Sequence, residues 1–354
     1  MQTRLVCTMV MVAWTVGSVA SSKKPTPVLT QNLHTFGFLN RSKPETGSYS
    51  DVVFLTDETV LVTINERVFS GNVVYPFEDK PPSKLLLFDV SQSKLVRTVE
   101  FPIEKNIHSV RATQNGEFVL LNEEGAHLCS ATLECGISVP GRGPVLVSPR
   151  GTKLIVGGNG QTEQKLLDST TLRELGRFSF HHPDVVPGET ALLVQSERRL
   201  SVRQAGQPER PIPFGGGFIW PDARFLNDHM IAGFESDTSL AVADFDGNIL
   251  YRIPATTRRN LATLVASSSG ARFCIHEVGY THWNSIVNFL DIDSGRSFNF
   301  ERVTVLETNS GHLLFKLEWD PRPYGGGLTD PALSPDGHRL AIIRNGSLEV
   351  FEIR

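Results

Sequence analysis

The sequence predicts an all-β fold, and three observations support this. Apolar residues rarely recur at helical spacing, while turn-forming residues interrupt the chain roughly every ten residues. One unit, an apolar strand followed by a short polar turn and a second apolar strand, recurs along the chain. The clearest copy ends the chain, as Pro331–Arg354.

This final copy predicts three antiparallel strands. A Pro-Asp-Gly turn and an Asn-Gly turn separate its apolar runs, and Gly337 and Gly346 supply the positive φ that tight reversals require. The runs Leu340–Ile343 and Leu348–Ile353 are rich in β-forming residues. Because three strands cannot bury both faces of a sheet, we expect similar units on either side.

Seven turns of this kind are found along the chain: Thr56–Glu58, Gln114–Gly116, Pro149–Gly151, Pro187–Glu189, Asn227–Asp228, Ser268–Gly270 and Pro335–Gly337. Apolar strands flank them: Val52–Leu55 and Val60–Val62, Phe118–Leu121, Val145–Val147 and Leu154–Val156, Ala191–Val194, Met230–Phe234, Leu261–Val265 and Phe273–Ile275, and Leu340–Ile343. Several units add a third strand with an Asp-led turn: Leu85–Asp89, Lys165–Asp168, Leu240–Asp244 and Val287–Asp291.

Seven units spaced by about forty residues predict a seven-bladed β-propeller of four-stranded blades. The last unit has three strands, and the N-terminal run Asn32–Leu39 is expected to add the fourth and close the ring. Six or eight blades are alternatives, because Val303–Leu306 and His312–Trp319 form an extra segment, interpreted as an insertion. A two-sheet sandwich is the other alternative.

The turn Ser334-Pro335-Asp336-Gly337 resembles the repeat turn of WD40-like and YVTN-type bacterial β-propellers, and Ser148-Pro149-Arg150-Gly151 departs from it by an arginine in place of the acid. The resemblance implies the propeller fold over nearly the whole chain after the signal segment. Such families include binding modules, lactonase-like hydrolases and quinoprotein-type dehydrogenases. The resemblance therefore implies the fold without a function.

The N-terminus predicts export. Arg4, the apolar run Leu5–Val16 and the small residues Ser18–Ala20 form a secretory signal peptide over residues 1–20, cleaved before Ser21. An uncleaved anchor is the alternative, although the apolar run is short for a transmembrane helix. Residues 21–30 are expected to be a flexible leader and residues 31–354 a single propeller domain. We expect a periplasmic or extracellular protein.

The formal net charge of −4 argues against nucleic acid as a partner, because the phosphate backbone requires a basic surface. Removal of residues 1–20 takes away Arg4 and no acid, so the charge becomes −5. No later stretch is long and apolar enough to predict an integral membrane segment after cleavage.

Cys129, Cys135 and Cys274 remain after cleavage. Cys129 and Cys135 flank a short polar turn, where cross-strand partners of a hairpin can approach bonding distance, so they are a candidate disulfide. The alternative of two free thiols stays open. Cys274 lies in an apolar run, Arg272–Ile275, and is expected to be a buried thiol.

Long irregular segments predict a candidate binding site. Glu66–Ser83, His276–Ser285 and Glu318–Asp330 belong to connections that leave the face of the ring opposite the seven short turns. They fall in blades six, seven and one, which are neighbours in a closed ring. Together with the connection into blade five, they contribute aromatic and charged candidates for ligand binding: Phe69, Tyr75, Phe77, Trp220, Tyr280, His282, Trp283, Trp319, Arg322 and Tyr324. The alternative is a lid whose aromatics pack on one another.

No catalytic residue, metal site or cofactor is predicted. His276-Glu277 precedes His282 by the wrong interval for a zinc-binding helix, and no nucleophile motif is present. The first hypothesis is an exported binding or scaffold protein whose ligand is an unknown protein or carbohydrate. The second is a hydrolase or lactonase-like enzyme with a site at the channel mouth, where His282 and Asp320 would be the residues to test.

Overall fold

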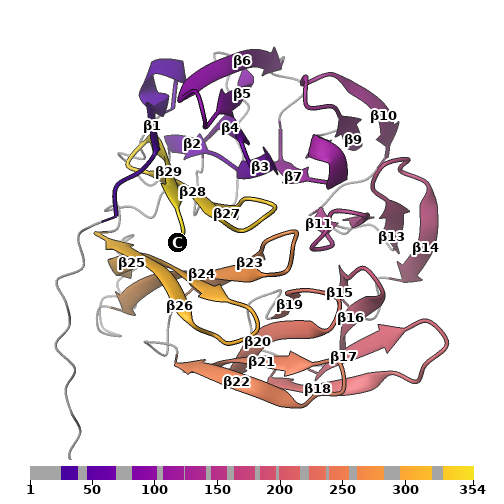
Figure 1. Ribbon diagram of the computed structural model, residues 1–354. Helices are drawn as coiled ribbons and strands as arrows, with labels where there is room; N and C mark the ends of the chain where they lie inside the picture. The colour runs from indigo at the N-terminus through magenta and orange to yellow at the C-terminus, as the bar shows by residue number, and fades with distance from the viewer. Residues whose placement is uncertain are drawn as a thin grey trace, which may run out of the picture.

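The computed structural model describes residues 25–38, 46–68, 82–101, 107–122, 124–140, 145–157, 163–179, 184–196, 199–215, 223–236, 239–254, 261–282, 296–320 and 330–354. In these residues the strands form seven antiparallel sheets arranged as blades around a central axis (Figure 1). The predicted seven-bladed β-propeller is confirmed.

Within each blade, the four strands are called first to fourth from the central axis outward. The first strands are β3 (Val52–Thr56), β7 (Ser109–Ala112), β11 (Leu146–Val147), β15 (Asp184–Pro187), β19 (Ala223–Phe225), β23 (Leu261–Ala266) and β27 (Ala332–Leu333). The second strands are β4 (Thr59–Val68), β8 (Phe118–Leu121), β12 (Lys153–Gly157), β16 (Ala191–Ser196), β20 (Met230–Ser236), β24 (Arg272–His282) and β28 (Arg339–Arg344).

The third strands are β5 (Ser83–Asp89), β9 (Ala126–Cys129), β13 (Glu163–Asp168), β17 (Arg199–Gln204), β21 (Ser239–Asp244), β25 (Arg296–Glu307) and β29 (Ser347–Glu352). The fourth strands are β6 (Lys94–Phe101), β10 (Cys135–Val139), β14 (Glu174–Ser179), β18 (Arg210–Gly215), β22 (Ile249–Pro254), β26 (Leu313–Trp319) and β1 (Leu29–Asn32). Blade one carries an additional strand, β2 (Thr46–Tyr49). The described residues also form two short 3-10 turns, η1 (Leu33–Phe36) and η3 (Gln114–Gly116).

All seven predicted turns join a first strand to a second strand, so they lie on one face of the ring. In a meander, the second-to-third and inter-blade connections leave the other face. We call the first the turn face and the second the connection face. The connection face is where the long segments singled out in the sequence begin and end.

The N-terminal strand closes the ring, but it begins earlier than expected. Strand β1 pairs with β29 from Leu29↔Val350 to Asn32↔Ser347, so Leu29 and Thr30, assigned to the leader, belong to the propeller. Residues 33–36 form η1 in place of the expected strand, with the Asn32 side chain accepting a hydrogen bond from His34 N. The correct strand is less apolar than the predicted run, because a fourth strand buries one face only.

The expected insertion at Val303–Leu306 and His312–Trp319 is also wrong. These residues lie in β25 and β26, the third and fourth strands of blade six. The run Val287–Asp291, predicted as the third strand, lies outside the described residues. The expectation fails for blade six because its second and third strands are unusually long, β24 with 11 residues and β25 with 12. Within the described ranges, no helix has the length and apolar character needed to cross a membrane.

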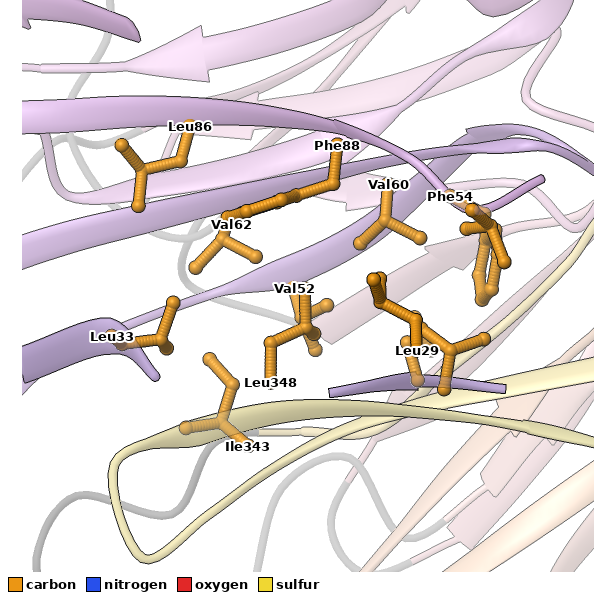
Figure 2. Close-up of a cluster of buried hydrophobic side chains, with 14 of the residues drawn as sticks. Leu29, Leu33, Val52, Phe54, Val60, Val62, Leu86, Phe88, Ile343 and Leu348 are labelled. Carbon is orange, nitrogen blue, oxygen red and sulfur yellow. The ribbon is translucent and has the colours of Figure 1, made fainter. Parts of the chain in front are cut away.

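The core consists of apolar layers between neighbouring blades, one for each of the seven interfaces in the described residues. Figure 2 shows the layer between blades seven and one, where Leu29 and Leu348 face Val60 and Phe88. Leu29 is 2% exposed, and Phe36 and Phe38 pack in the same layer as Val350. Closure therefore buries apolar surface in addition to pairing an edge strand.

Three of the seven turns share a hydrogen-bond pattern that starts at a buried serine. In the last turn, Ser334 O accepts from Gly337 N at 2.8 Å, and Ser334 Oγ accepts from Arg339 N at 2.8 Å. The same bonds, three and five residues after the serine, recur in blades three and six: Ser148, Gly151 and Lys153; Ser267, Gly270 and Arg272.

The lysine or arginine five residues after the serine contacts the turn of the next blade. Its nitrogen donates to a backbone carbonyl there in all three cases: Lys153 to Glu189, Arg272 to Gly337 at 3.1 Å, and Arg339 to Asp57. The glycine needs positive φ, and a Cβ on Gly151 would lie 2.6 Å from the backbone carbon of Thr113 in the preceding blade. The turns therefore lock adjacent blades together on the turn face.

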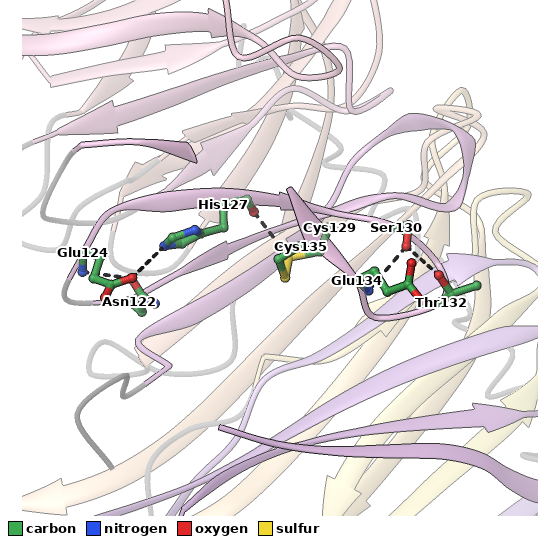
Figure 3. The surroundings of a disulfide bond; sticks show 8 residues. All are labelled: Asn122, Glu124, His127, Cys129, Ser130, Thr132, Glu134 and Cys135. Carbon is green, nitrogen blue, oxygen red and sulfur yellow. Dashed lines mark hydrogen bonds and ion pairs between the residues drawn. A yellow bond between two sulfur atoms is a disulfide. The ribbon is translucent and has the colours of Figure 1, made fainter. Parts of the chain in front are cut away.

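Cys129 and Cys135 form a disulfide, and they are cross-strand partners between β9 and β10 (Figure 3). The intervening turn is closed by Leu133 N donating to Ser130 O at 2.9 Å. Cys274 is a buried free thiol, as expected.

Substitution of Leu29 by alanine is expected to destabilise the ring. Removal of a buried leucine side chain at the closing strand should lower the free energy of unfolding by about 2–5 kcal/mol. The measurement is denaturant unfolding of the chain from Ser21. Val28→Ala, at a neighbouring residue that is 41% exposed, is the control and should change little. Equal effects of the two substitutions would contradict closure by β1.

Reduction of the disulfide is expected to cost about 2 kcal/mol, the loop-entropy value for so short a loop. Unfolding of the chain from Ser21 with and without dithiothreitol measures this cost, and the Cys129→Ser/Cys135→Ser variant should not respond to the reductant. Thiol titration of the unfolded, unreduced protein should detect Cys274 alone. Detection of all three thiols would count against the bond.

Candidate functional site

Of the ten predicted ligand-binding residues, Trp319 is the one whose side chain the structure describes. Tyr280 and His282 lie in strand β24. The others lie outside the described residues: Phe69, Tyr75, Phe77, Trp220, Trp283, Arg322 and Tyr324. Ligand binding by these ten residues stays a prediction. The contacts of Trp319 show how the connection face is built near blades six and seven.

Blades six and one are prolonged toward the connection face. The segment from His276, expected to be an irregular insertion, continues as strand through His282, and the β24–β25 ladder runs from Arg272↔Glu307 to His282↔Arg296. In blade one, β2 pairs with the far end of β4, from Thr46↔Val68 to Tyr49↔Asn65. Second strands run away from the turn face, so both extensions lie on the connection face and flank blade seven.

Glu301 organises a polar cluster at this end of the interface between blades six and seven. Its Oε1 lies 2.9 Å from His276 Nε2, and its Oε2 accepts from Trp319 Nε1 at 2.9 Å. The His276 and Trp319 rings are stacked, with centroids 6.4 Å apart and planes 15° apart. Since His276 is 3% exposed, Glu301 supplies the partner that a buried imidazole requires.

Blade seven contributes a cation to the same cluster. The Arg344 guanidinium lies 6.0 Å from the Trp319 ring centroid, and Glu349 holds it with N–O distances of 2.8 and 2.7 Å. Trp319 also packs against the apolar layer between the two blades. The Trp319 indole therefore already has partners for its N–H and its ring. It stabilises the interface between blades six and seven beneath the connection face.

The opposite side of blade six carries a second buried ion pair. Arg302 Nε donates to Glu277 Oε2 at 3.0 Å, and Arg302 Nη1 lies 3.4 Å from Glu318 Oε2. The guanidinium carbon lies 4.7 Å from the Phe300 ring centroid. Polar contacts thus fasten the prolonged hairpin of blade six on both of its faces.

A cavity of about 230 Å³ occupies the centre of the ring and is lined by the first strands of all seven blades. Four of the described lining residues are charged: Asp51, Arg111, Arg224 and Asp330. None of these four residues is among the site residues predicted from the sequence. The available signal was a charged residue within or just before an otherwise apolar first strand, as with Arg224 between Ala223 and Phe225.

Asp51 and Arg111 form an ion pair in this cavity. Asp51 Oδ1 lies 3.3 Å from Arg111 Nη1, and Asp51 Oδ2 accepts from Val110 N at 3.0 Å. Burial raises the pKa of the Asp51 carboxyl, which is partly offset by the Arg111 charge and the Val110 N–H. The Asp51 backbone is fixed by Thr63, whose N donates to Asp51 O at 2.9 Å.

Arg224 differs from Arg111. Its Nη1 is buried and has no hydrogen-bond partner in the described part of the chain. Burial lowers the pKa of Arg224 to about 10, while the Asp330 charge acts in the opposite direction. The guanidinium remains protonated at neutral pH.

Within the described ranges, no group of three or more His, Cys, Asp or Glu side chains is placed to hold a metal ion. The Cys274 thiol lies in the core between blades six and seven, and burial raises its pKa well above the ordinary value. It therefore stays protonated at neutral pH and is a structural thiol.

The topology defines the chain as a seven-bladed β-propeller of antiparallel blades. The C-terminal WD40 domain of Sif2 is similar to it at 12% identity and a TM-score of 0.49, covering 94% of this chain and 99% of that one. Kluyveromyces lactis Hsv2p is similar at 12% identity and a TM-score of 0.46, covering 83% and 89%. No family model and no curated protein matches the sequence.

Removal of the Glu301 carboxylate is expected to destabilise the blade six–seven interface. Glu301→Ala leaves the buried His276 ring and the Trp319 N–H without this acceptor, at a cost of about 1–3 kcal/mol for a buried group left unpaired. Denaturant unfolding measures the loss. Glu352→Ala, on an exposed glutamate of β29, is the control, with a change within about 0.5 kcal/mol. A silent Glu301→Ala would show that the cluster contributes no stability.

Proposed function

We propose that the chain is an exported binding protein whose propeller presents the connection face over blades six, seven and one to a protein or carbohydrate ligand. One observation carries the proposal. Among the described residues, blades six and one alone carry the prolonged second-strand pairings, and both prolongations flank blade seven on that face. Prolonged strands give the connecting segments a rigid base, and binding residues are commonly found on loops held by such a base.

The polar clusters under this face support the same proposal. The Glu301 cluster and the Arg302–Glu277 pair hold blade six on both sides with side chains that are largely withdrawn from water. A buried ion pair contributes little net stability compared with apolar packing. Its retention in blade six is consistent with a need to hold the prolonged hairpin in one orientation.

Two observations support export. The N-terminal segment has the charged start, apolar run and small-residue cleavage signal of a secretory peptide. The Cys129–Cys135 disulfide joins two residues of a short hairpin, and disulfides persist mainly in oxidising compartments. The alternative function, a hydrolase acting at the channel mouth, stays a prediction.

The test is binding of the immobilised chain from Ser21 to a carbohydrate array and to the exported proteins of its own cell. Trp283→Ala and Tyr324→Ala should each weaken the detected interaction at least tenfold, because aromatic side chains dominate such contacts. Trp319→Ala is a poor probe, since that ring also stabilises the fold.

The matched controls are exposed apolar residues on outer strands far from this face, Val96→Ala in blade one and Leu250→Ala in blade five. They should leave binding unchanged. Fractionation of the full-length chain should recover it outside the cytoplasm, in the form that begins at Ser21. An interaction that survives both aromatic substitutions, or retention of the chain in the cytoplasm, would reject the proposal.

A further inference from the structure

The central cavity has the dimensions of a site for a small molecule. Its volume of about 230 Å³ exceeds the room needed by several waters, each of which occupies about 30 Å³ in the liquid. It is smaller than the pockets of about 300–1,000 Å³ that take drug-sized ligands. Its wall combines apolar side chains, such as Phe54 and Phe225, with four charged groups.

The four charges divide into a satisfied pair and an open pair. Asp51 and Arg111 bind each other, and Arg111 Nη1 also donates to Val110 O at 2.8 Å. Arg224 and Asp330 are close enough for their charges to interact, but no hydrogen bond joins them in the described part of the chain. Arg224 Nη1 therefore has unused hydrogen-bonding capacity, and Asp330 lines the same cavity.

Arg224 has the stronger requirement for a ligand. A guanidinium carries five N–H donors, and a buried donor without an acceptor costs free energy, more so when it is charged. The backbone of Arg224 is held in β19 opposite Ala232, so the side chain cannot leave the cavity by moving the strand. An acceptor supplied from outside would relieve this cost.

The charge balance decides what kind of acceptor fits. Among the described residues that line the cavity, two arginines and two aspartates sum to no net charge when ionised. A lone anion would add a charge that these four side chains leave unbalanced, and its transfer from water would be costly. A molecule that carries a carboxylate and an ammonium group together keeps the balance.

We propose that the central cavity binds a small zwitterion of the free amino acid class, with its carboxylate accepting from Arg224 and its ammonium group facing Asp330. A planar guanidinium can donate two parallel hydrogen bonds to a carboxylate, which suits this role. The site is distinct from the connection-face binding proposed above, and neither depends on the other.

The test is the thermal unfolding midpoint of the chain from Ser21 with added glycine, L-alanine, L-serine or L-glutamate, followed by calorimetry. At least one amino acid should raise the midpoint in a saturable way, because a ligand of the folded state stabilises it. Acetate carries only the carboxylate and methylammonium only the ammonium group, so neither should shift the midpoint at the same concentration.

Arg224→Met separates a ligand-binding arginine from a structural one. The variant should unfold at a higher temperature than the wild type without ligand, and should bind the amino acid at least tenfold more weakly. Asp330→Asn tests the ammonium side and should also weaken binding at least tenfold. Arg150→Met, on an arginine whose side chain is 59% exposed on the turn face, is the control and should bind normally.

Three results would overturn the proposal. The first is no shift with any amino acid, which would leave the cavity to water. The second is an equal shift with acetate alone, which would make the site one for simple anions. The third is unchanged amino acid binding in both Arg224→Met and Asp330→Asn, which would place the site elsewhere.

Discussion

Closure of the ring is the constraint on which the rest of the structure depends. Strand β1 completes blade seven by pairing with β29, and its Leu29 enters the apolar layer shared with blade one. On the turn face Arg339 of blade seven reaches the Asp57 carbonyl of blade one and pairs with Glu58 at 2.8 Å. Strand pairing and the turn-face contacts together join blade seven to blade one, so neither blade leaves a sheet face exposed.

The two faces of the ring are built differently, and this difference separates structure from function. On the turn face, a buried serine, a glycine and a cation repeat in blades three, six and seven, and the cation of each binds the turn of the next blade. Close packing at Gly151 and Gly270 leaves no space for a side chain there, since a Cβ would lie 2.6 Å from an atom of the preceding blade at each position. Connections on the other face are not part of these contacts, so they can vary in length and composition without opening the ring.

Among the described residues, buried charged side chains gather at two places, in blade six and at the central cavity. In blade six, Glu301 and Glu277 each have a partner that uses their oxygens, and the effect is to stiffen a prolonged hairpin. In the central cavity, Arg224 has a buried nitrogen without a partner among the described residues. The Glu301 and Glu277 carboxylates thus have partners within blade six, whereas Arg224 Nη1 has capacity for one more acceptor.

The sequence by itself determined the all-β class, the seven repeats and the seven turns, because alternating apolar strands and positive-φ glycines are local signals. It also indicated the Cys129–Cys135 hairpin, since cross-strand partners are set by a short turn. Only the tertiary structure decided that the closing strand is Leu29–Asn32, that β25 and β26 belong to blade six, and that Asp51, Arg111, Arg224 and Asp330 meet at the axis. These residues come from blades one, two, five and seven and become neighbours only when the ring closes. Local sequence patterns do not indicate contacts between residues so far apart in the chain.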